Sequence, residues 1–332
     1  MKIAVFSAKS YDKEYLTRAN QQGHELTFFE ARLSVETAPL IKGHAACCVF
    51  VHDRVTRDAL EIFAKENCTL LALRCAGFNN VDIEAAQEFG IHVVRVPAYS
   101  PHGVAEFAVS LIMGLNRKVH RAHHRVRELN FSLEGLTGFD LFGKTVGVIG
   151  TGKIGFCFAQ IMLGFGCKVI CYDLHPNKEV EAIGAKYVPL ESLFAESDII
   201  SLHCPLTPSS RYFINQSTLN RMKNGVMLIN TSRGELIKTQ DVIQSLKDGK
   251  VGYLGIDVYE EEEGIFFEDM SSSIVKDDVL SRLLTFPNVL ITSHQAFFTD
   301  EALMNIAKTT MDNITEFDEN GSCENEVSST VN

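Results

Sequence analysis

Basic residues are the minority charge in this chain. It contains 31 lysines and arginines against 42 aspartates and glutamates, and its formal net charge is −11 at pH 7. A net negative protein has no general electrostatic attraction to nucleic acid or to anionic lipid. The composition therefore argues against both nucleic acid and membrane as partners.

Long hydrophobic runs and paired cysteines are also lacking. No uninterrupted apolar run approaches the roughly 18 residues of a membrane span. The N-terminus becomes charged after a handful of apolar residues, which is too soon for a signal peptide. The nine cysteines are scattered from Cys47 to Cys323 with no CxxC pair, a pattern typical of reduced thiols and not of a disulfide framework. We therefore expect a cytoplasmic protein.

The chain does contain enough apolar material for more than one core. Hydrophobic residues make up 45% of its 332 residues, which excludes a disordered or fibrous chain. Single cores rarely grow beyond about 250–300 residues. The length therefore suggests two domains.

Strands and helices alternate through the first hundred residues. Short segments rich in valine, isoleucine, phenylalanine and leucine predict strands at 2–7, 25–29, 45–51, 70–75 and 92–96. Segments with helical spacing lie between them at 57–65 and 83–89. This alternation predicts a parallel sheet with helices on its faces.

A long helical stretch follows, from residue 103 to 129. Its first half is apolar, and its second half, 117–127, is basic. The basic half is either a patch for an anion or nucleic acid, or a solvated helix face. Aromatic residues do not interleave with the basic ones, which favours the solvated face.

A second series of strands begins near residue 145. Strands are predicted at 146–149, 168–172, 199–203, 226–230, 253–258 and 289–292, with helices at 153–165, 240–247 and 299–317. The last stretch, 321–332, is polar, and the sequence alone leaves open whether it is ordered.

A glycine turn joins strand 146–149 to helix 153–165. Gly150 allows a tight turn, Gly152 lets the backbone approach a pyrophosphate, and Gly155 lets the helix and strand pack closely. The helix N-terminus adds unpaired N–H groups and partial positive charge for the anion. The motif predicts a dinucleotide site.

Asp173, at the end of the next strand, specifies the dinucleotide. An acidic side chain there accepts hydrogen bonds from the ribose hydroxyls of NAD and repels the 2′-phosphate of NADP. No arginine occurs at 174–177, so the sequence predicts NAD. The cofactor site is expected to include further residues of the turn and of neighbouring strand ends: Thr151, Lys153, Ile154, His203, Cys204, Pro205, Thr231 and Ser232.

Polar segments follow three later strands, at 230–235, 255–262 and 292–297. Ligands of open α/β sheets bind beyond the carboxyl ends of the strands, so these segments can converge on one site. With PAYSP at 97–101, NFSLEGLTG at 130–138 and SLHCPLTP at 201–208, the chain resembles the D-isomer-specific 2-hydroxyacid dehydrogenases. Among these it is similar to the fermentative bacterial D-lactate dehydrogenases, over essentially its whole length.

The resemblance implies a role for three side chains. Arg233 matches the substrate-binding arginine of the family, and a planar guanidinium suits a two-pronged grip on a carboxylate. His294 matches the acid/base histidine, and Glu262 matches its carboxylate partner. A carboxylate beside the ring stabilises the protonated imidazolium, which is the form that gives up a proton during reduction.

The resemblance also implies residues that bind the two ligands. Asp257 matches the acidic residue that holds the nicotinamide end of NAD. Residues implied to bind the substrate, including backbone N–H groups that cup its carboxylate, are Cys75, Ala76, Gly77, Tyr99 and Phe297. No metal is implied. Cys167 and Cys171 have no histidine beside them, and we interpret them as core thiols.

The implied fold is α/β, with two doubly wound parallel-sheet domains and a cleft between them. Residues 1–100 and 298–332 would form a flavodoxin-like substrate domain, and residues 101–297 a Rossmann NAD-binding domain. The implied activity is NADH-dependent reduction of pyruvate to D-lactate by a homodimer or homotetramer.

Two alternatives to this activity stay open. One is a dehydrogenase of another 2-keto acid, of branched, aromatic or glycerate type. The other is an NAD-sensing binding protein, similar to the corepressors of this fold. The retained set of Arg233, Glu262 and His294 argues against the second alternative, because a binding module has no need of acid/base chemistry.

Overall fold

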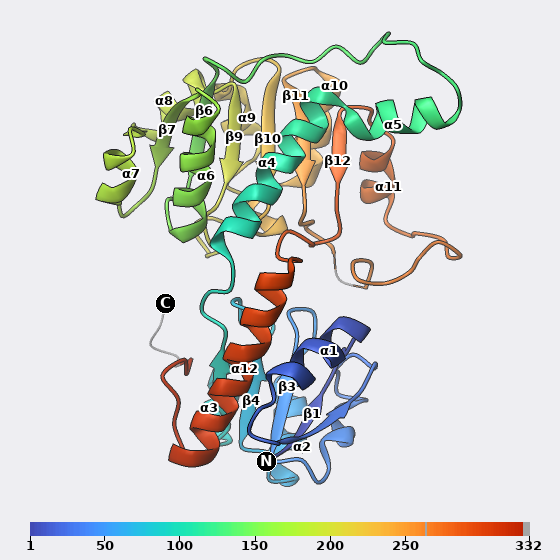
Figure 1. The fold of residues 1–332 in the computed structure, drawn as a ribbon, viewed down its shortest axis with the longest axis vertical. Coiled ribbons are helices and arrows are strands. Elements are labelled where there is room, and N and C mark those ends of the chain that lie inside the picture. Colours follow the sequence, from blue (N-terminus) through green and yellow to red (C-terminus); the bar gives the residue numbers. More distant parts are fainter. Residues whose placement is uncertain (263, 328–332) are drawn as a thin grey trace. The chain divides into compact units, whose positions relative to one another are not determined.

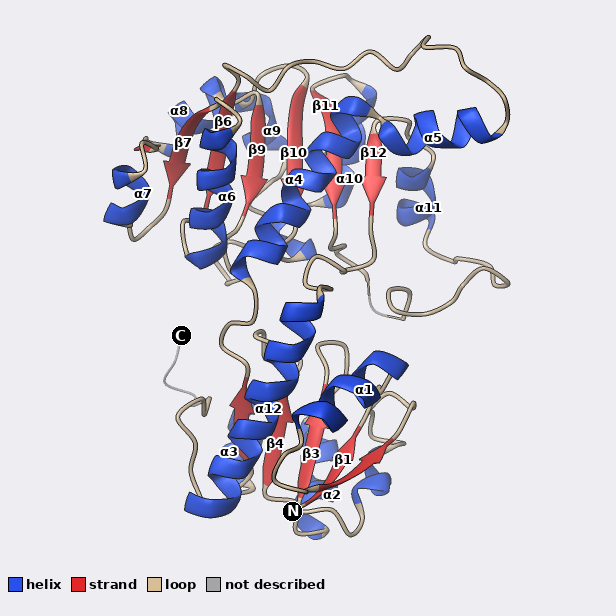
Figure 2. Ribbon diagram, viewed as in Figure 1, coloured by secondary structure: helices blue, strands red, loops and turns tan. Residues whose placement is uncertain are grey.

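The structure, a computed structural model, describes residues 1–262 and 264–327. The chain forms two compact units, one of Met1–Ser100 with Phe298–Asn332 and one of Pro101–Phe297 (Figure 1). Each unit is built on its own parallel sheet, with helices on both faces (Figure 2). The predicted fold class, α/β with two parallel sheets, is confirmed.

The first unit contains a five-stranded sheet with the order β2-β1-β3-β4-β5, which is the flavodoxin-like order. Its elements are β1 (Lys2–Val5), α1 (Ser10–Ala19), β2 (Glu25–Phe28), η1 (Ala38–Ile41), β3 (Ala46–Val49), α2 (Arg57–Lys65), β4 (Leu70–Leu73), α3 (Ile83–Glu88), β5 (His92–Arg95) and α12 (Asp300–Asn320).

The core of this unit explains why its ends meet. Every residue of β3 and β4 is buried, as expected for central parallel strands covered on both faces. α12 packs against α1 and β4, and contributes Ala307, Met311 and Ile314 to the core (Figure 1). The last helix of the chain therefore completes a unit that the first hundred residues begin.

The second unit contains a seven-stranded sheet with the order β12-β11-β10-β9-β6-β7-β8. Its elements are α4 (Pro101–Arg117), α5 (Val119–Arg127), β6 (Thr145–Ile149), α6 (Lys153–Gly164), β7 (Lys168–Tyr172), α7 (Lys178–Ala182), β8 (Lys186–Tyr187), α8 (Leu190–Glu196), β9 (Ile199–Leu202), α9 (Gln216–Arg221), β10 (Val226–Asn230), η2 (Gly234–Leu236), α10 (Thr239–Lys247), β11 (Val251–Ile256), α11 (Asp278–Leu284) and β12 (Val289–Ile291).

Two hydrophobic cores lie on opposite faces of this sheet. On one face α4 and α6 pack against the strands, and Cys167 and Cys171 are buried among them, as predicted. On the other face α8, α9, α10 and α11 supply the core. Strand order reverses between β6 and β9, and such a switch point is where open α/β sheets bind ligands.

The expected helix 103–129 is two helices. α4 ends at Arg117, and Lys118 adopts a left-handed conformation, with φ of +50°, before α5 begins at Val119. The Lys118 ammonium donates hydrogen bonds to the carbonyls of Gly135 and Thr137, at 3.0 and 2.9 Å. No residue of α5 is buried, so no core contact holds α5 in line with α4. The basic half of the expected helix is thus exposed, and the choice between an anion patch and a solvated face stays a prediction.

The described part of the polar tail, 321–327, packs against the rest of the first unit. Cys323 and Val327 are buried. The Val327 N–H donates to the Val93 carbonyl at 2.7 Å, and the Arg95 N–H donates to the Asn325 carbonyl at 3.1 Å. This segment therefore pairs with β5 at the edge of the sheet. Residues 328–332 lie outside the described residues.

Among the helices of the described residues, none is both long enough and apolar enough to span a bilayer.

Candidate active site

The turn after β6 requires glycine at two of its positions. Gly150 has φ of +91°, and a Cβ there would lie 2.6 Å from the His203 carbonyl oxygen. A Cβ on Gly155 would lie 2.0 Å from the Gly150 carbonyl oxygen, so α6 could not pack so closely on the turn. A Cβ on Gly152 would meet nothing within 4 Å. Gly152 therefore borders open space and has no protein neighbour at its Cα that would exclude a side chain.

The N-terminus of α6 is suited to an anion. Gly152 is its N-cap, and glycine has no side chain with which to cap the helix. The first N–H groups of a helix have no partner inside the helix, and they carry partial positive charge. Open space at Gly152 and these N–H groups together fit the pyrophosphate of a dinucleotide.

Asp173 is held in one orientation. Its Oδ2 accepts hydrogen bonds from the Thr151 N–H at 2.6 Å and the Thr151 hydroxyl at 3.0 Å, and its Oδ1 accepts one from the His175 N–H at 2.8 Å. Partial burial raises the pKa of Asp173, but the bonds from His175 and Thr151 outweigh it and hold the pKa below its ordinary value. The side chain is therefore an anion at neutral pH.

His203, which follows β9, lies under the glycine turn. Its Nε2 is 2.9 Å from the Ser201 hydroxyl, and its ring lies 4.8 Å from that of Phe158. Burial lowers the pKa of His203 to about 3, so the ring is neutral at pH 7. The structure thus shows a packing role, and the predicted contact with cofactor stays a prediction.

The segment after β10 carries a buried hydroxyl with no partner. The Thr231 Oγ1 makes no hydrogen bond within the described part of the chain, although the residue is only 8% exposed. Beside it, the Ser232 hydroxyl donates to the Cys204 carbonyl at 3.0 Å. Burying an unpaired hydroxyl costs free energy, so this atom fits a site that a bound group completes.

Three further cofactor candidates lie near the same edge. Lys153 and Ile154 open α6, the first exposed and the second half-buried. Pro205 is exposed, and its carbonyl accepts a hydrogen bond from the Ser210 hydroxyl at 2.8 Å. For Lys153, Ile154 and Pro205 the structure shows only a position near the sheet edge. Their predicted contact with NAD stays a prediction.

Arg233 presents a cation whose hydrogen bond among the described residues goes to a backbone carbonyl and not to a carboxylate. Its Nη1 donates to the Ser232 carbonyl at 2.7 Å, and its own carbonyl accepts from the Asn230 side chain at 2.8 Å. The next residue, Gly234, approaches the 255–262 segment closely, because a Cβ there would lie 2.1 Å from the Tyr259 carbonyl oxygen. The segments after β10 and β11 are therefore adjacent, as the sequence predicted.

His294 and Glu262 form a hydrogen-bonded pair. The His294 Nδ1 lies 2.9 Å from the Glu262 Oε1, and the two side chains are 17% and 27% exposed. The other oxygen of Glu262 accepts from the Tyr259 N–H at 3.1 Å. Because Nδ1 faces the carboxylate, Nε2 is the nitrogen that can exchange a proton with a substrate.

Asp257 holds the loop that carries His294. Its carboxylate is fully buried and accepts hydrogen bonds from the Thr292 hydroxyl at 2.6 Å and from the N–H groups of Gln295 and Ala296 at 2.9 and 2.8 Å. Burial raises its pKa above the ordinary value, although these bonds oppose the rise. The predicted contact with nicotinamide stays a prediction, and the structure adds this positioning role.

Sequence reasoning missed Phe267. Its ring centroid lies 5.8 Å from that of His294, and both residues have positive φ, +67° and +54°. Left-handed backbone at non-glycine residues costs free energy and is often found at functional sites. Nothing in the spacing of the 264–276 segment singles out Phe267, whose contact depends on the path of the loop.

The substrate candidates of the first unit lie after β4 and β5. The Cys75 thiol donates to the Gly77 carbonyl at 3.2 Å, and Arg95 donates to the Ala76 carbonyl at 2.9 Å. Both bonds are made to backbone carbonyls of the 75–77 loop, and they hold that loop in place. The Tyr99 carbonyl accepts from Asn305 at 2.9 Å.

Phe297, the remaining candidate, is buried at the last position of the second unit. The structure also shows a buried residue beside the substrate loop that the sequence analysis did not single out. Arg74, only 1% exposed, precedes the 75–77 loop and is anchored by Asp12 at 3.0 Å.

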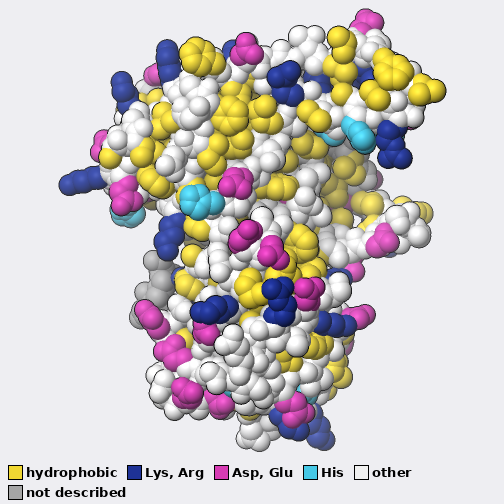
Figure 3. Space-filling view, viewed as in Figure 1, with side chains coloured by type: hydrophobic (Ala, Val, Ile, Leu, Met, Phe, Trp, Pro, Cys, Tyr) yellow, Lys and Arg dark blue, Asp and Glu magenta, His cyan; other side chains and the backbone are white. Residues whose placement is uncertain are grey.

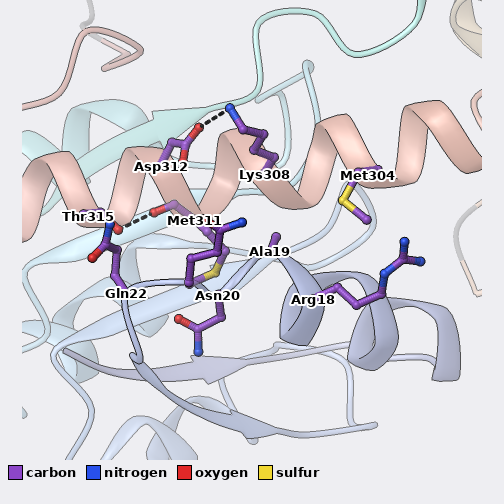
Figure 4. A pocket seen from close by; sticks show the side chains of 10 residues that line it. Arg18, Ala19, Asn20, Gln22, Met304, Lys308, Met311, Asp312 and Thr315 are labelled. Atoms are coloured by element: carbon purple, nitrogen blue, oxygen red, sulfur yellow. Dashed lines mark hydrogen bonds and ion pairs between the residues drawn. The ribbon is translucent and has the colours of Figure 1, made fainter.

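A separate surface hollow of about 110 Å³ lies between α1 and α12 in the first unit (Figure 4). Lys308 lies on its rim and pairs with Asp312 at 3.3 Å. Arg18 pairs with Glu14 at 3.5 Å. Its cations are thus already neutralised, and none of the predicted site residues lines it.

A glycine turn at the switch point of a Rossmann-type sheet, followed by a fixed aspartate, defines an NAD-binding α/β protein. Residues 109–296 match the family model described as D-isomer specific 2-hydroxyacid dehydrogenase, NAD binding domain. The chain belongs to the D-isomer specific 2-hydroxyacid dehydrogenase family, and its cofactor is NAD. The resemblance seen in the sequence is confirmed.

Relatives of known name cover nearly the whole chain. The D-lactate dehydrogenase of Escherichia coli strain K12 is 51% identical over 328 residues, 98% of this chain and 100% of that one. The solved structure of the pyruvate reductase of Chlamydomonas reinhardtii is 45% identical, with a TM-score of 0.93 over 98% of both chains. The D-lactate dehydrogenase of Lactobacillus jensenii, solved with NAD⁺, is 30% identical, with a TM-score of 0.82 over 99% of this chain and 100% of that one.

Two glycines of the turn should respond differently to alanine. Gly155→Ala places a methyl group against backbone, and we expect it to lower the free energy of unfolding by about 1–3 kcal/mol. Gly152→Ala is compatible with φ of −64° and should leave stability within about 0.5 kcal/mol, while weakening NADH binding. Urea unfolding and NADH titration measure both effects. Unchanged NADH affinity in Gly152→Ala would contradict the proposed pyrophosphate position.

Proposed function

We propose that this protein catalyses the reversible, NADH-dependent reduction of pyruvate to D-lactate. The observation that carries the proposal is the His294–Glu262 pair, 2.9 Å apart, at the sheet edge where Arg233 also lies. A proton donor and a cation that binds a carboxylate are what a 2-keto acid requires. The names of the similar enzymes from Escherichia coli and Chlamydomonas support pyruvate as the acid.

The side chains divide the chemistry between them. When bound, NADH supplies the hydride that reduces the carbonyl carbon of the keto acid. His294, protonated, donates the proton on its Nε2 to the carbonyl oxygen, and takes it back in the oxidising direction. Glu262 orients the ring through Nδ1 and stabilises the imidazolium before the proton leaves.

The remaining residues bind the two ligands. Arg233 grips the substrate carboxylate through two N–H donors. The glycine turn and the α6 N-terminus hold the pyrophosphate, Asp173 holds the adenosine ribose, and Thr231 contributes its unpaired hydroxyl. The assignments of Cys75, Ala76, Gly77, Tyr99 and Phe297 to the substrate, and of Asp257 to the nicotinamide, rest on the family resemblance.

We also propose a cytoplasmic homo-oligomer. None of the nine cysteines, all within the described residues, forms a disulfide, which supports a reducing compartment. The arm formed by α5 and residues 128–137 reaches away from the sheet (Figure 1), and hydrophobic side chains gather where it does so (Figure 3). Its exposed hydrophobic residues include Leu129, Phe131 and Leu133. Such a patch is unusual on a monomer, and a second copy would cover it.

Arg233→Lys tests the substrate assignment. NADH oxidation with pyruvate should fall roughly 10- to 100-fold in kcat/KM, because lysine cannot reproduce the two-pronged bond, while the NADH Kd stays within about twofold. Arg221→Lys, which alters an exposed pair with Glu191, is the matched control and should behave as wild type. Equal loss of NADH binding and turnover would refute the carboxylate role. A panel of keto acids, with chiral analysis of the product, identifies the preferred substrate.

The His294–Glu262 hydrogen bond should govern the rate of turnover. Glu262→Gln should lower kcat for pyruvate reduction by about 10-fold or more, because the imidazole loses the carboxylate that orients it through Nδ1. The exposed neighbour variant Glu261→Gln should leave kcat unchanged. A kcat that stays within about twofold of wild type in Glu262→Gln is the result that rules out the coupling.

Charge on the arm should weaken assembly. The double variant Phe131→Glu and Leu133→Glu should shift the oligomer toward monomer by roughly 10-fold or more in dissociation constant, because both side chains are mainly exposed in the isolated chain. Leu284→Glu, at another exposed hydrophobic position, is the control. Light scattering during size-exclusion chromatography measures the mass, and an unchanged oligomer in the double variant would exclude the arm as the interface.

A further inference from the structure

Tyr187 occupies a place that the proposed chemistry does not use. It ends β8, an edge strand of two residues that is paired to β7 through Cys171. Its hydroxyl lies 2.7 Å from the Thr151 hydroxyl, in the glycine turn, and 2.8 Å from the Asn177 N–H, at the N-cap of α7. One hydroxyl therefore links the segments after β6 and β7, which lie beside each other in the sheet (Figure 1).

The direction of these hydrogen bonds follows from the chemistry of the groups. Asp173 is a carboxylate and can only accept, so the Thr151 hydroxyl must donate its single proton to Oδ2. Thr151 then accepts from Tyr187 at 2.7 Å, which is much nearer than the other acceptor for that proton, the Asn177 carbonyl at 3.5 Å. Tyr187 in turn accepts from the Asn177 N–H. The result is a one-way chain of donors that ends on an anion, and each bond polarises the next.

The chain leaves the Asp173 carboxylate with a defined vacancy. A carboxylate offers about four acceptor positions, and three are filled, two of them on Oδ2. Among the residues that the structure describes, Oδ1 accepts only from the His175 N–H and keeps one position. Oδ2 is thus turned toward the glycine turn, while Oδ1 remains able to accept from a ribose hydroxyl.

We propose that Tyr187 is a positioning residue for NAD, which fixes the Asp173 carboxylate against the ribose and thereby sharpens the preference for NADH over NADPH. The proposal rests on the cofactor site assigned above, but not on pyruvate as the substrate. A fixed carboxylate both accepts from the ribose of NADH and repels the 2′-phosphate of NADPH. A carboxylate that can rotate away does both less well.

The test is Tyr187→Phe in the full-length protein, with NADH and NADPH titrated by fluorescence in the absence of keto acid. Loss of one hydrogen bond in the chain should raise the NADH Kd about three- to tenfold. The NADPH Kd should stay the same or fall, so that discrimination narrows. With saturating NADH and pyruvate, kcat should stay within about twofold, because Tyr187 does not contact the reacting atoms.

Tyr253→Phe is the matched control. Tyr253 lies on β11 in the same unit, and its hydroxyl makes no hydrogen bond among the described residues, so both affinities should remain unchanged. In an Asp173→Ala background, Tyr187→Phe should add less than about a twofold change in NADH Kd, because its effect acts through the carboxylate.

Three results would overturn the proposal. The first is an NADH Kd that Tyr187→Phe leaves within twofold. The second is an equal rise of the NADH Kd and the NADPH Kd, which would indicate a general disturbance of the second unit. The third is a full additional effect in the Asp173→Ala background. Since binding is measured without keto acid, failure to reduce pyruvate would count against the proposed reaction and leave this readout intact.

Discussion

The sheet edge that carries His294 and Glu262 depends on the hydrogen bonds made by the fully buried carboxylate of Asp257. A charge inside a protein is stable only when hydrogen bonds replace its lost water. Here the replacement comes from the hydroxyl of Thr292 and the N–H groups of Gln295 and Ala296. Because the Asp257 carboxylate needs these donors, the segment after β12 lies close to the end of β11. The same bonds fix the backbone on either side of His294.

This constraint explains the unusual backbone of His294. Its N–H donates to the Asp257 carbonyl at 2.6 Å while Gln295 and Ala296 bind the carboxylate of the same residue. Such a tight wrap around one residue is compatible with the positive φ of His294. The imidazole is then directed at Glu262, so a positioned proton donor results from the burial of a different acid.

Local sequence patterns predicted the parts of the structure that depend on neighbours in the chain. The strands, the glycine turn and Asp173 were readable because their spacing reflects strand ends and helix starts. Tyr187 was not readable, since β8 has two residues and its hydroxyl meets partners from two other segments. The break at Lys118 was hidden for the same reason, because its bonds reach the later 135–137 segment. Contacts made by tertiary approach leave no periodic signal.

The helix α5 has a consequence for how this enzyme can vary. It contributes no buried side chain, and the break at Lys118 separates it from α4, which packs on the sheet. Substitutions at exposed positions outside the core change folding free energy little. Substitutions in the arm should therefore act on the proposed assembly, with little effect on the folding of the sheet that carries the glycine turn and the His294 loop. The residues of the exposed arm and the residues of the catalytic edge can consequently be altered independently in this chain.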